Sequence, residues 1–443
     1  MTIAVTQPRV RALLRGLLGA ALAAADPALA LRRSVTRRGH WLHVGRTRYD
    51  LRRYQRVVAV GAGKASAHMA VALEHVLGSR LEGGLVVVKY GHAAPTRRVA
   101  ILEAGHPVPD RAGRQAARRV LAYVRGLSSD DLVLVLLSGG ASSLLPAPAP
   151  GLTLADKQRV TALLLRSGAT IQEINAVRKH LSAIKGGRLA AATKARVVSL
   201  ILSDVLGDDL GAIASGPTAP DPTTYADAIA VCRRHGIWSS LPSAVRHCLL
   251  AGQRGLRPES PKPGSSVFRR VQNQVIGNNR AAIAALAREA RRRGFQPRIL
   301  TAVLTGEARE AGRRFGTMAR RLAENRKPTR VCLIAGGELT VSVRGNGKGG
   351  RAQEFALAAA GEIAGMKRVW IAGFGTDGTD GPTDAAGAVV TGQTYGAAVR
   401  KGLNPVDALR RNDSYTFFKQ SGGLITTGAT GTNVNDLYLL LVT

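Results

Sequence analysis

The chain has 443 residues, 45% of them hydrophobic, and is long enough for two or three domains with substantial cores. Its 63 lysines and arginines against 29 aspartates and glutamates give a formal net charge of +34. The basic residues are scattered, without a long basic block, an aromatic-rich sheet motif or zinc-ligand spacing. We therefore do not expect a nucleic-acid partner, although the charge favours the approach of anionic substrates.

The cysteines and the N-terminal region bear on the compartment. The chain has three cysteines, Cys232, Cys248 and Cys332. They are far apart and lack C-x-x-C spacing, which argues for a reducing compartment without a disulfide framework or zinc site. Residues 11–33 are rich in Ala and Leu, but Arg15 and Asp26-Pro27 interrupt the apolar run, and its leucines have helical spacing. We expect a packed amphipathic helix in a cytoplasmic protein, and no segment long enough to span a membrane.

The first half of the chain alternates predicted strands and helices after a short β excursion in residues 41–53. The expected strands, each an apolar run, are 56–60, 84–89, 99–103, 131–137 and 197–202. The expected helices are 65–77, 111–125, 153–167 and 171–192. Continuous apolar runs are typical of strands buried on both faces, and this alternation predicts a large, doubly wound α/β domain.

A stretch containing Pro, Gly and Ser, residues 252–266, indicates a domain boundary. We predict domains at 1–250 and 271–443, joined by a linker at 251–270. The second domain again mixes both element types. Its expected strands are 271–276, 296–300, 331–335, 340–343, 369–374 and 437–442, and its expected helices are 281–293 and 352–364. The prediction is therefore a second, smaller α/β domain.

Three glycine-rich loops each follow a predicted strand, where small residues let backbone N–H groups approach an anion. The first loop contains Gly61, Gly63 and Lys64. It lacks the last glycine of G-x-G-x-x-G, and the chain has no P-loop motif. Lys64, at the start of a helix, is suited to neutralising a transferring phosphoryl group. As a merely solvated lysine it would oppose the helix dipole.

The second and third loops add further candidates. The candidate phosphate-binding residues of the second loop are Ser138, Gly139, Gly140, Ser142 and Ser143. The alternative there is the tight turn of an ordinary βα unit. The third loop, 345–351, matches G-x-G-x-x-G, but no acid follows about 20 residues on, so the match is weak. It carries Lys348 and Arg351, and Arg351 is the better candidate because its planar fork can hold a carboxylate or phosphate bidentately.

Acidic residues complete the inventory. Asp204 follows strand 197–202, at the carboxyl end where open α/β sheets place ligands. It suits proton transfer or metal binding, and a helix cap is the ordinary alternative. A later turn-rich loop contains Asp377, Asp380 and Asp384. Their spacing does not match an EF-hand, so we expect turn acids there, and a packed turn histidine at His106. Anion nests, cations and one acid at strand ends suit phosphoryl transfer.

Long stretches of the chain resemble the glycerate 2-kinase family, whose members are also labelled hydroxypyruvate reductase. The matching segments are VGAGKAS, GHPVPD, LLSGGASSLL, INAVRKHLSAIKGGRLA, LILSDVLGDDLGAIASGPTAPD, GGELTVSVRGNGKGGRAQEFAL, GFGTDGTDGPTDAAGAVV and TGATGTNVNDL, in family order from about Val60 to the C-terminus. The resemblance implies a large N-terminal α/β domain, a smaller C-terminal α/β domain of the type called MOFRL, and a cleft between them.

The resemblance also implies phosphorylation of D-glycerate with ATP and Mg²⁺, giving 2-phosphoglycerate. The family's catalytic lysine, acid and arginine fall on Lys64, Asp204 and Arg351. The metal ligands, the phosphorylated oxygen and a homo-oligomeric assembly stay open. One alternative is an NAD(P)H-dependent hydroxypyruvate reductase, which is disfavoured because neither glycine loop carries the full dinucleotide signature. The other, suggested only by charge, is a nucleic-acid-binding protein.

Overall fold

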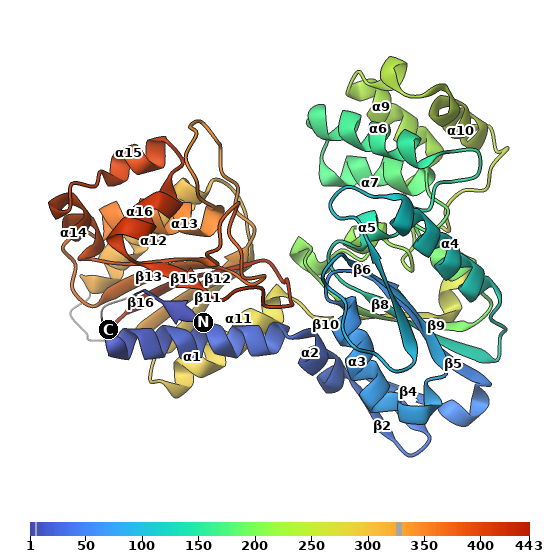
Figure 1. Ribbon diagram of the computed structural model, residues 1–443, viewed down its shortest axis with the longest axis horizontal. Helices are drawn as coiled ribbons and strands as arrows, with labels where there is room; N and C mark the ends of the chain where they lie inside the picture. The colour runs from blue at the N-terminus through green and yellow to red at the C-terminus, as the bar shows by residue number, and fades with distance from the viewer. Residues whose placement is uncertain (5–6, 325–329) are drawn as a thin grey trace. The chain divides into compact units, whose positions relative to one another are not determined.

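A computed structural model describes residues 1–4, 7–324 and 330–443 of the chain. It divides into two compact units, one made of Pro27–Ile276 and the other of Met1–Asp26 together with Gly277–Thr443. Each unit is built around its own β-sheet with helices packed against it (Figure 1). The predicted α/β class is therefore confirmed.

The unit Pro27–Ile276 contains a six-stranded sheet in the order β10-β9-β8-β5-β6-β7. Its strands are β5 (Arg56–Ala62), β6 (Gly83–Lys89), β7 (Val99–Ala104), β8 (Asp131–Leu137), β9 (Arg196–Leu202) and β10 (Val271–Gly277). Strands β5 to β9 run parallel. From β5 the chain moves to one side through β6 and β7, then returns to the other side through β8 and β9. This order makes the boundary between β5 and β8 a topological switch point, where such sheets bind ligands.

Helices cover both faces of this sheet. On one face, α4 (Arg111–Arg125) packs on alternate strand residues such as Val58, Val60 and Val133. On the other face, α3 (Ser66–Leu77) packs against β6 and β8. The unit also contains α2 (Pro27–Ser34), α5 (Ala141–Leu144) and α8 (Arg188–Ala191). The expected β excursion is a three-stranded antiparallel sheet of β2 (Val35–Arg38), β3 (Trp41–Val44) and β4 (Thr47–Asp50).

Four helices gather at one end of this unit (Figure 1) and share a hydrophobic core of their own. They are α6 (Leu154–Arg166), α7 (Ile171–His180), α9 (Tyr225–Arg234) and α10 (Ser243–Gln253). The prediction of one helix over 171–192 was wrong, because α7 ends at His180. Gly186 and Gly187 then adopt φ of +58° and +77°, which a right-handed helix cannot accommodate. The loop that results turns Lys185 into the protein, where it is 2% exposed.

The other unit contains a seven-stranded mixed sheet in the order β1-β15-β14-β13-β16-β12-β11. Its strands are β1 (Thr2–Ile3), β11 (Gln296–Leu304), β12 (Val331–Gly337), β13 (Val369–Gly375), β14 (Gly387–Thr391), β15 (Leu424–Thr426) and β16 (Asp436–Val442). Strands β11 and β12 pair in parallel, whereas the remaining pairs are antiparallel. Strand β16 lies inside the sheet between β13 and β12, and all of its residues are buried.

Figure 1 shows α1 and α11 on one side of this sheet, with α12, α13, α15 and α16 on the other. The helices are α1 (Pro8–Ala25), α11 (Asn279–Arg292), α12 (Ala308–Ala323), α13 (Arg351–Glu362), α14 (Thr394–Arg400), α15 (Pro405–Arg410) and α16 (Ser414–Ser421). An aromatic cluster joins α12, α13 and β16. The Phe355 ring lies 5.0 Å from that of Phe315 and 4.7 Å from that of Tyr438, in the tilted arrangements that aromatic pairs prefer.

The division into units differs from the predicted boundaries at 1–250, 251–270 and 271–443. The N-terminal helix α1 packs on α11, and Thr432 donates a hydrogen bond of 2.5 Å to the carbonyl oxygen of Ala25. Strand β1 extends the second sheet by pairing with β15. Conversely, β10 lies beside β9 in the first sheet. Amphipathic patterns show that an element has a buried face, but not which partner covers it.

The strand predicted at 340–343 was also wrong. Thr340 makes a single isolated bridge to Glu307, and no strand forms over these described residues. The N–H of Ser342 instead donates to the Glu307 carboxylate, at 3.2 and 3.1 Å from its two oxygens. Apolar alternation there is too short to decide between a strand and an extended loop.

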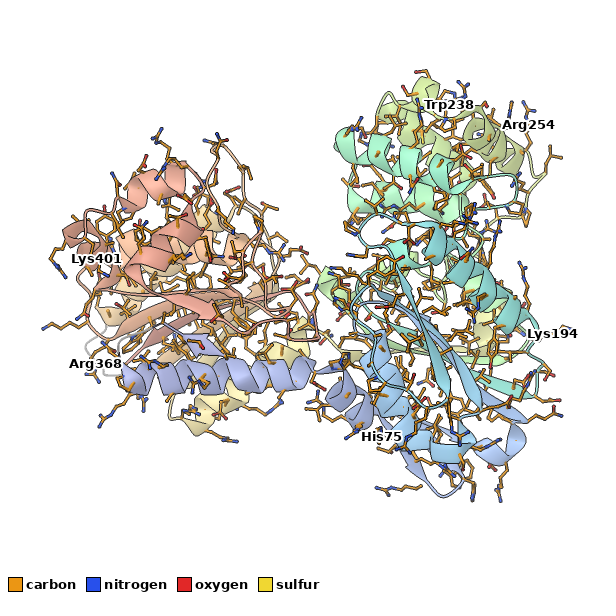
Figure 2. The ribbon with its side chains drawn as sticks, in the orientation of Figure 1. His75, Lys194, Trp238, Arg254, Arg368 and Lys401 are labelled. Atoms are coloured by element: carbon orange, nitrogen blue, oxygen red, sulfur yellow. The ribbon has the colours of Figure 1, made fainter. Side chains whose placement is uncertain are left out.

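Within the described part of the chain, no single helix is long and apolar enough to cross a membrane, although α1 and α2 taken together pass on length and composition. The leucines of α1 at positions 14, 17 and 18 are buried in its own unit. Exposed basic side chains are widely dispersed. Lys194, Arg254, Arg368 and Lys401 project outward from different elements (Figure 2).

Candidate active site

Two of the glycine-rich loops form one structure at the switch point of the parallel sheet. Ala62 and Leu137, the last residues of β5 and β8, are paired in register, so the loops begin side by side. The N–H of Lys64 donates to the carbonyl oxygen of Gly139 at 2.9 Å, and the N–H of Ala65 donates to Ser138 Oγ at 3.0 Å. The loop after β5 is thereby fixed to the loop after β8.

Strand β9 brings Asp204 to the same edge of the sheet, because Ile201 is paired with Leu137. The carboxylate lies against the backbone of Gly139, where a Cβ would come within 2.1 Å of Asp204 Oδ2. On the neighbouring glycine, Gly140, a Cβ would lie 3.4 Å from Lys64 Cγ. The Gly139-Gly140 turn therefore lies next to both Asp204 and Lys64, and a side chain at Gly139 would collide with the Asp204 carboxylate.

The serine hydroxyls of the second loop are engaged within the protein. Ser138 Oγ accepts from Ala65 and lies 3.0 Å from Ser66 Oγ, while Ser143 Oγ donates to the carbonyl oxygen of Gly140 at 3.0 Å. Among the described residues, no protein acceptor is found for the N–H groups of Gly139 and Gly140. The groups of this loop that are available to an anion are thus backbone N–H groups rather than the hydroxyls that the sequence suggested.

His106, which follows β7, also lies at this edge and is not simply a packed turn residue. Its Nε2 would be 2.9 Å from a Cβ on Gly140. Burial lowers the pKa of His106 to about 4, and the charges of Lys64 and Lys89 act in the same direction. The imidazole is therefore neutral at physiological pH.

A cavity of about 250 Å³ opens beside this turn, and sequence analysis did not identify it. Its lining includes Gly140 and His106 together with three cationic side chains, those of Lys157, Arg178 and Lys185. Two of the three fall in the segment INAVRKHLSAIKGGRLA. The sequence feature that could have indicated this cavity is the number of cations in an otherwise apolar helical pattern. The pattern does not show that Lys185 points inward, because that depends on the end of the helix before Gly186-Gly187.

The third predicted residue, Arg351, lies in the other unit at the start of α13. Its Nε donates to Asp436 Oδ2 at 2.5 Å, and its Nη1 to Glu338 Oε1 at 2.6 Å. Burial lowers the pKa of Arg351, but the two carboxylates more than offset this and raise it above the usual value. Burial raises the pKa of Asp436 to about 6, so this carboxylate is largely ionised at neutral pH. The guanidinium is thus charged and held in one orientation.

The acids of the turn-rich loop have structural partners. Asp380 accepts from the N–H groups of Ala352 and Gln353 at 3.0 and 2.8 Å, and so caps α13 next to Arg351. Burial raises its pKa to about 7. Asp377 accepts from the N–H of its neighbour Thr379 at 3.0 Å. These contacts agree with the expectation of turn acids, and Asp380 in addition fixes the start of the helix that carries Arg351.

The described residues do not form a magnesium site from side chains alone. The described residues contain no group of three or more His, Cys, Asp or Glu side chains that could hold a metal. Magnesium in phosphoryl-transfer sites is commonly bound through one or two carboxylates plus substrate phosphates. Asp204 supplies one carboxylate at this edge of the sheet, and with the phosphates of a bound nucleotide it would be the group to hold such an ion.

Comparison with known proteins extends over nearly the whole chain. Residues 13–250 match the family described as a domain of unknown function, DUF4147, and residues 331–436 match the MOFRL family. The chain is 42% identical to a glycerate 2-kinase of Pyrococcus horikoshii, over 96% of each protein. It is 44% identical to a putative hydroxypyruvate reductase of Agrobacterium vitis, over 98% of this chain and 94% of that one. A crystal structure of a glycerate kinase from Thermotoga maritima matches with a TM-score of 0.88 at 41% identity, covering 99% of this chain and 100% of that one.

Proposed function

Since this chain belongs to the glycerate 2-kinase family, with its MOFRL domain, we propose that it transfers the γ-phosphoryl group of ATP to D-glycerate, giving 2-phosphoglycerate and ADP. The observation that carries the proposal is the meeting of Lys64 and Asp204 at one glycine turn on the switch point of the parallel sheet. Phosphoryl transfer depends mainly on positioning and charge neutralisation, and this edge offers both.

The phosphate chain of ATP binds to the backbone N–H groups of Gly139 and Gly140, which have no protein acceptor among the described residues. Lys64 neutralises charge on the γ-phosphoryl group as it moves. Arg351 adds a second fixed positive charge, a role that the family resemblance implies and that its clamping by Asp436 and Glu338 supports. Fixed charges cost no reorganisation at the moment of reaction.

Asp204 accepts the proton of the C2 hydroxyl group of glycerate. The C2 oxygen then forms its bond to the γ-phosphorus, while the bond from that phosphorus to the β–γ bridging oxygen breaks and its electron pair leaves with ADP. Magnesium, when bound, neutralises charge on the β- and γ-phosphates. The alternative role for Asp204 is to help hold that ion together with the phosphates, in place of accepting the proton.

The test is ADP release by purified protein with D-glycerate, ATP and Mg²⁺, with L-glycerate and hydroxypyruvate run in parallel. We expect turnover that needs both ATP and D-glycerate. The similarity to a putative hydroxypyruvate reductase gives one further candidate, an NAD(P)H-dependent reduction. Loss of NADH absorbance with hydroxypyruvate in the absence of ATP, without ADP release from any acid, would favour that activity instead.

We also propose that the protein works in a reducing, cytoplasmic compartment. All three cysteines are buried free thiols. Burial raises the pKa of Cys232 to about 11 and that of Cys332 to about 12, which keeps these thiols protonated and unreactive. Fractionation of the native host, followed by detection of the protein, tests this directly.

A further inference from the structure

The cavity beside the Gly139-Gly140 turn is unusually cationic for an enclosed space. Lys157, Arg178 and Lys185 contribute to its lining, and no Asp or Glu does among the described residues. Lys157 is 8% exposed and Lys185 is 2% exposed. Charged side chains are almost never buried this deeply unless they are paired. The cavity therefore holds positive charge that the surrounding protein does not balance.

The hydrogen bonds of the two lysines confirm this imbalance. Lys185 Nζ donates to the carbonyl oxygen and to Oγ of Ser142, at 2.9 and 3.0 Å, and Lys157 Nζ donates to the carbonyl oxygen of Leu181 at 3.1 Å. These acceptors are neutral. In the described parts of the chain, no ion pair is found for either lysine or for Arg178. By contrast, Lys179, equally buried and next to Arg178 in sequence, pairs with Asp221 at 3.3 Å.

The uncompensated charge is costly to the fold. Burial lowers the pKa of Lys157 to about 7 and that of Lys185 well below its ordinary value, and the three cations also repel one another. Burial of an unpaired charge destabilises a protein by several kcal/mol or shifts its protonation. Strain of this kind is retained mainly at functional sites, where a ligand relieves it.

The cavity borders the proposed reaction site through Gly140. Gly140 and His106 line it, and the same Gly140 lies against the Lys64 side chain. Gly140 is thus common to the cavity wall and to the turn that borders Lys64, and the preceding residue, Gly139, borders Asp204. The volume of about 250 Å³ is below the range of pockets for larger ligands, about 300–1,000 Å³, but leaves room for a three-carbon acid.

We propose that this cavity binds the carboxylate group of the acceptor, a small 2-hydroxy acid, through Arg178 and Lys185, with Lys157 supplying a further positive charge. The proposal rests on the proposed function, which identifies the acceptor. It makes these cations specificity-determining residues, since an alcohol without a carboxylate would leave them unpaired. The neutral imidazole of His106 beside the carboxylate adds a polar group without adding charge.

Lys185→Met and Arg178→Gln test the proposal, with the exposed Lys194→Met as the matched control. We expect each cavity variant to raise the KM for D-glycerate, and its Kd by calorimetry without nucleotide, at least tenfold. The KM for ATP should stay within twofold, and Lys194→Met should behave as the parent protein. Because Lys185→Met removes a buried unpaired charge, its melting temperature without ligand should not fall.

Three ligand probes identify the chemistry. In the parent protein D-glycerate should raise the melting temperature, and glycerol, which lacks a carboxylate, should not. If inorganic phosphate and ATP, rather than D-glycerate, lose affinity in Lys185→Met and Arg178→Gln, the cavity binds phosphate and the proposal is overturned. An unchanged Kd for D-glycerate in both variants, or a fall in melting temperature as their only effect, would also overturn it.

These binding measurements need no turnover, so they separate the two proposals. If the parent protein releases no ADP, yet binds D-glycerate or hydroxypyruvate with an affinity that depends on Lys185 and Arg178, the proposed kinase reaction fails and the carboxylate site stands. If ADP is released but the KM for D-glycerate is the same in both variants, the kinase reaction stands and the carboxylate site fails.

Discussion

Arg351 in one unit and the cavity lysines in the other differ in how their positive charge is balanced. Arg351 sits between Asp436 and Glu338, which fix its orientation and hold its charge. Among the described residues, Lys157 and Lys185, in the other unit, hydrogen-bond only to neutral oxygens. A cation that is paired with carboxylates of the protein has a fixed charge and orientation. Buried cations without such partners can instead bind an anion from solution. The counter-charges therefore distinguish Arg351, whose charge is held in place by the protein, from the cavity lysines, whose counter-charge would come from a ligand.

The largest effect is expected at the cationic sheet edge. Lys64→Ala should lower kcat for D-glycerate by at least about 10³-fold, since a charge aimed at a transferring phosphoryl group is commonly worth that much. The fold should be intact, because the backbone N–H of Lys64, rather than its side chain, makes the contact with Gly139. Steady-state kinetics and circular dichroism check both points, and near-normal turnover would exclude Lys64 from the reaction.

Removing a counter-charge from the clamped arginine should destabilise the protein. Asp436→Asn leaves Arg351 partly buried with one carboxylate fewer, and we expect a loss of about 1–3 kcal/mol in the free energy of unfolding, together with lower kcat. Denaturant unfolding measures it. Asp407→Asn, which breaks an exposed pair with Arg410, is the control and should change stability by no more than about 0.5 kcal/mol. Equal effects of the two variants would show that the Asp436 carboxylate does not stabilise the protein by holding Arg351.

The close approach of Asp204 to a glycine gives a third test. Gly139→Ala would place a methyl group 2.1 Å from the present position of Asp204 Oδ2, so the carboxylate must move. We expect kcat to fall about tenfold or more, since small displacements of a catalytic group are costly. Gly19→Ala, in α1 with no atom within 4 Å of the new methyl group, should retain activity and gain roughly 0.5–1 kcal/mol in stability. Full activity of Gly139→Ala would argue against Asp204 as the base.

The smallest effect is a dependence of stability on pH. The pKa of Lys157 is about 7 in the folded protein, because of burial and the nearby charge of Arg178, against about 10.4 in an unfolded chain. The unfolded state therefore binds more protons between these values, and stability should rise as pH increases from about 7 to 10. Lys185 acts in the same direction, and Cys248 also faces Lys157. Melting temperatures across this range should rise less steeply in Lys157→Met than in Lys194→Met. Identical slopes in the two variants would show that folding does not lower the pKa of Lys157.

Much of the site at the parallel sheet could be predicted from the sequence. Lys64 and Asp204 each follow a buried apolar run, and the carboxyl ends of parallel strands meet at one edge, so their proximity follows from topology. The internal hydrogen bonds of the Ser138 and Ser143 hydroxyls could not be predicted, because a sequence does not reveal which polar groups are satisfied within the protein.

The remaining features depend on contacts between distant segments. Arg351 and Asp436 are 85 residues apart, and the position of β16 between β13 and β12 brings the acid to the start of α13. The partnership of α1 with α11 is likewise absent from local patterns, because an amphipathic helix does not specify its partner. The cationic cavity depends on the positive φ angles of Gly186 and Gly187 after α7, which end the helix and turn Lys185 inward. The periodicity of the sequence does not predict that helix end.

The most direct test of the account is the fate of the γ-phosphoryl group, followed by ³¹P NMR in a mixture of protein, ATP, Mg²⁺ and D-glycerate. The account predicts that the γ-phosphate signal is replaced by a single phosphomonoester, identified as 2-phosphoglycerate against an authentic standard, in equal amount to the ADP formed. Formation of inorganic phosphate alone, or no loss of the γ-phosphate signal while hydroxypyruvate oxidises NADH, would contradict it.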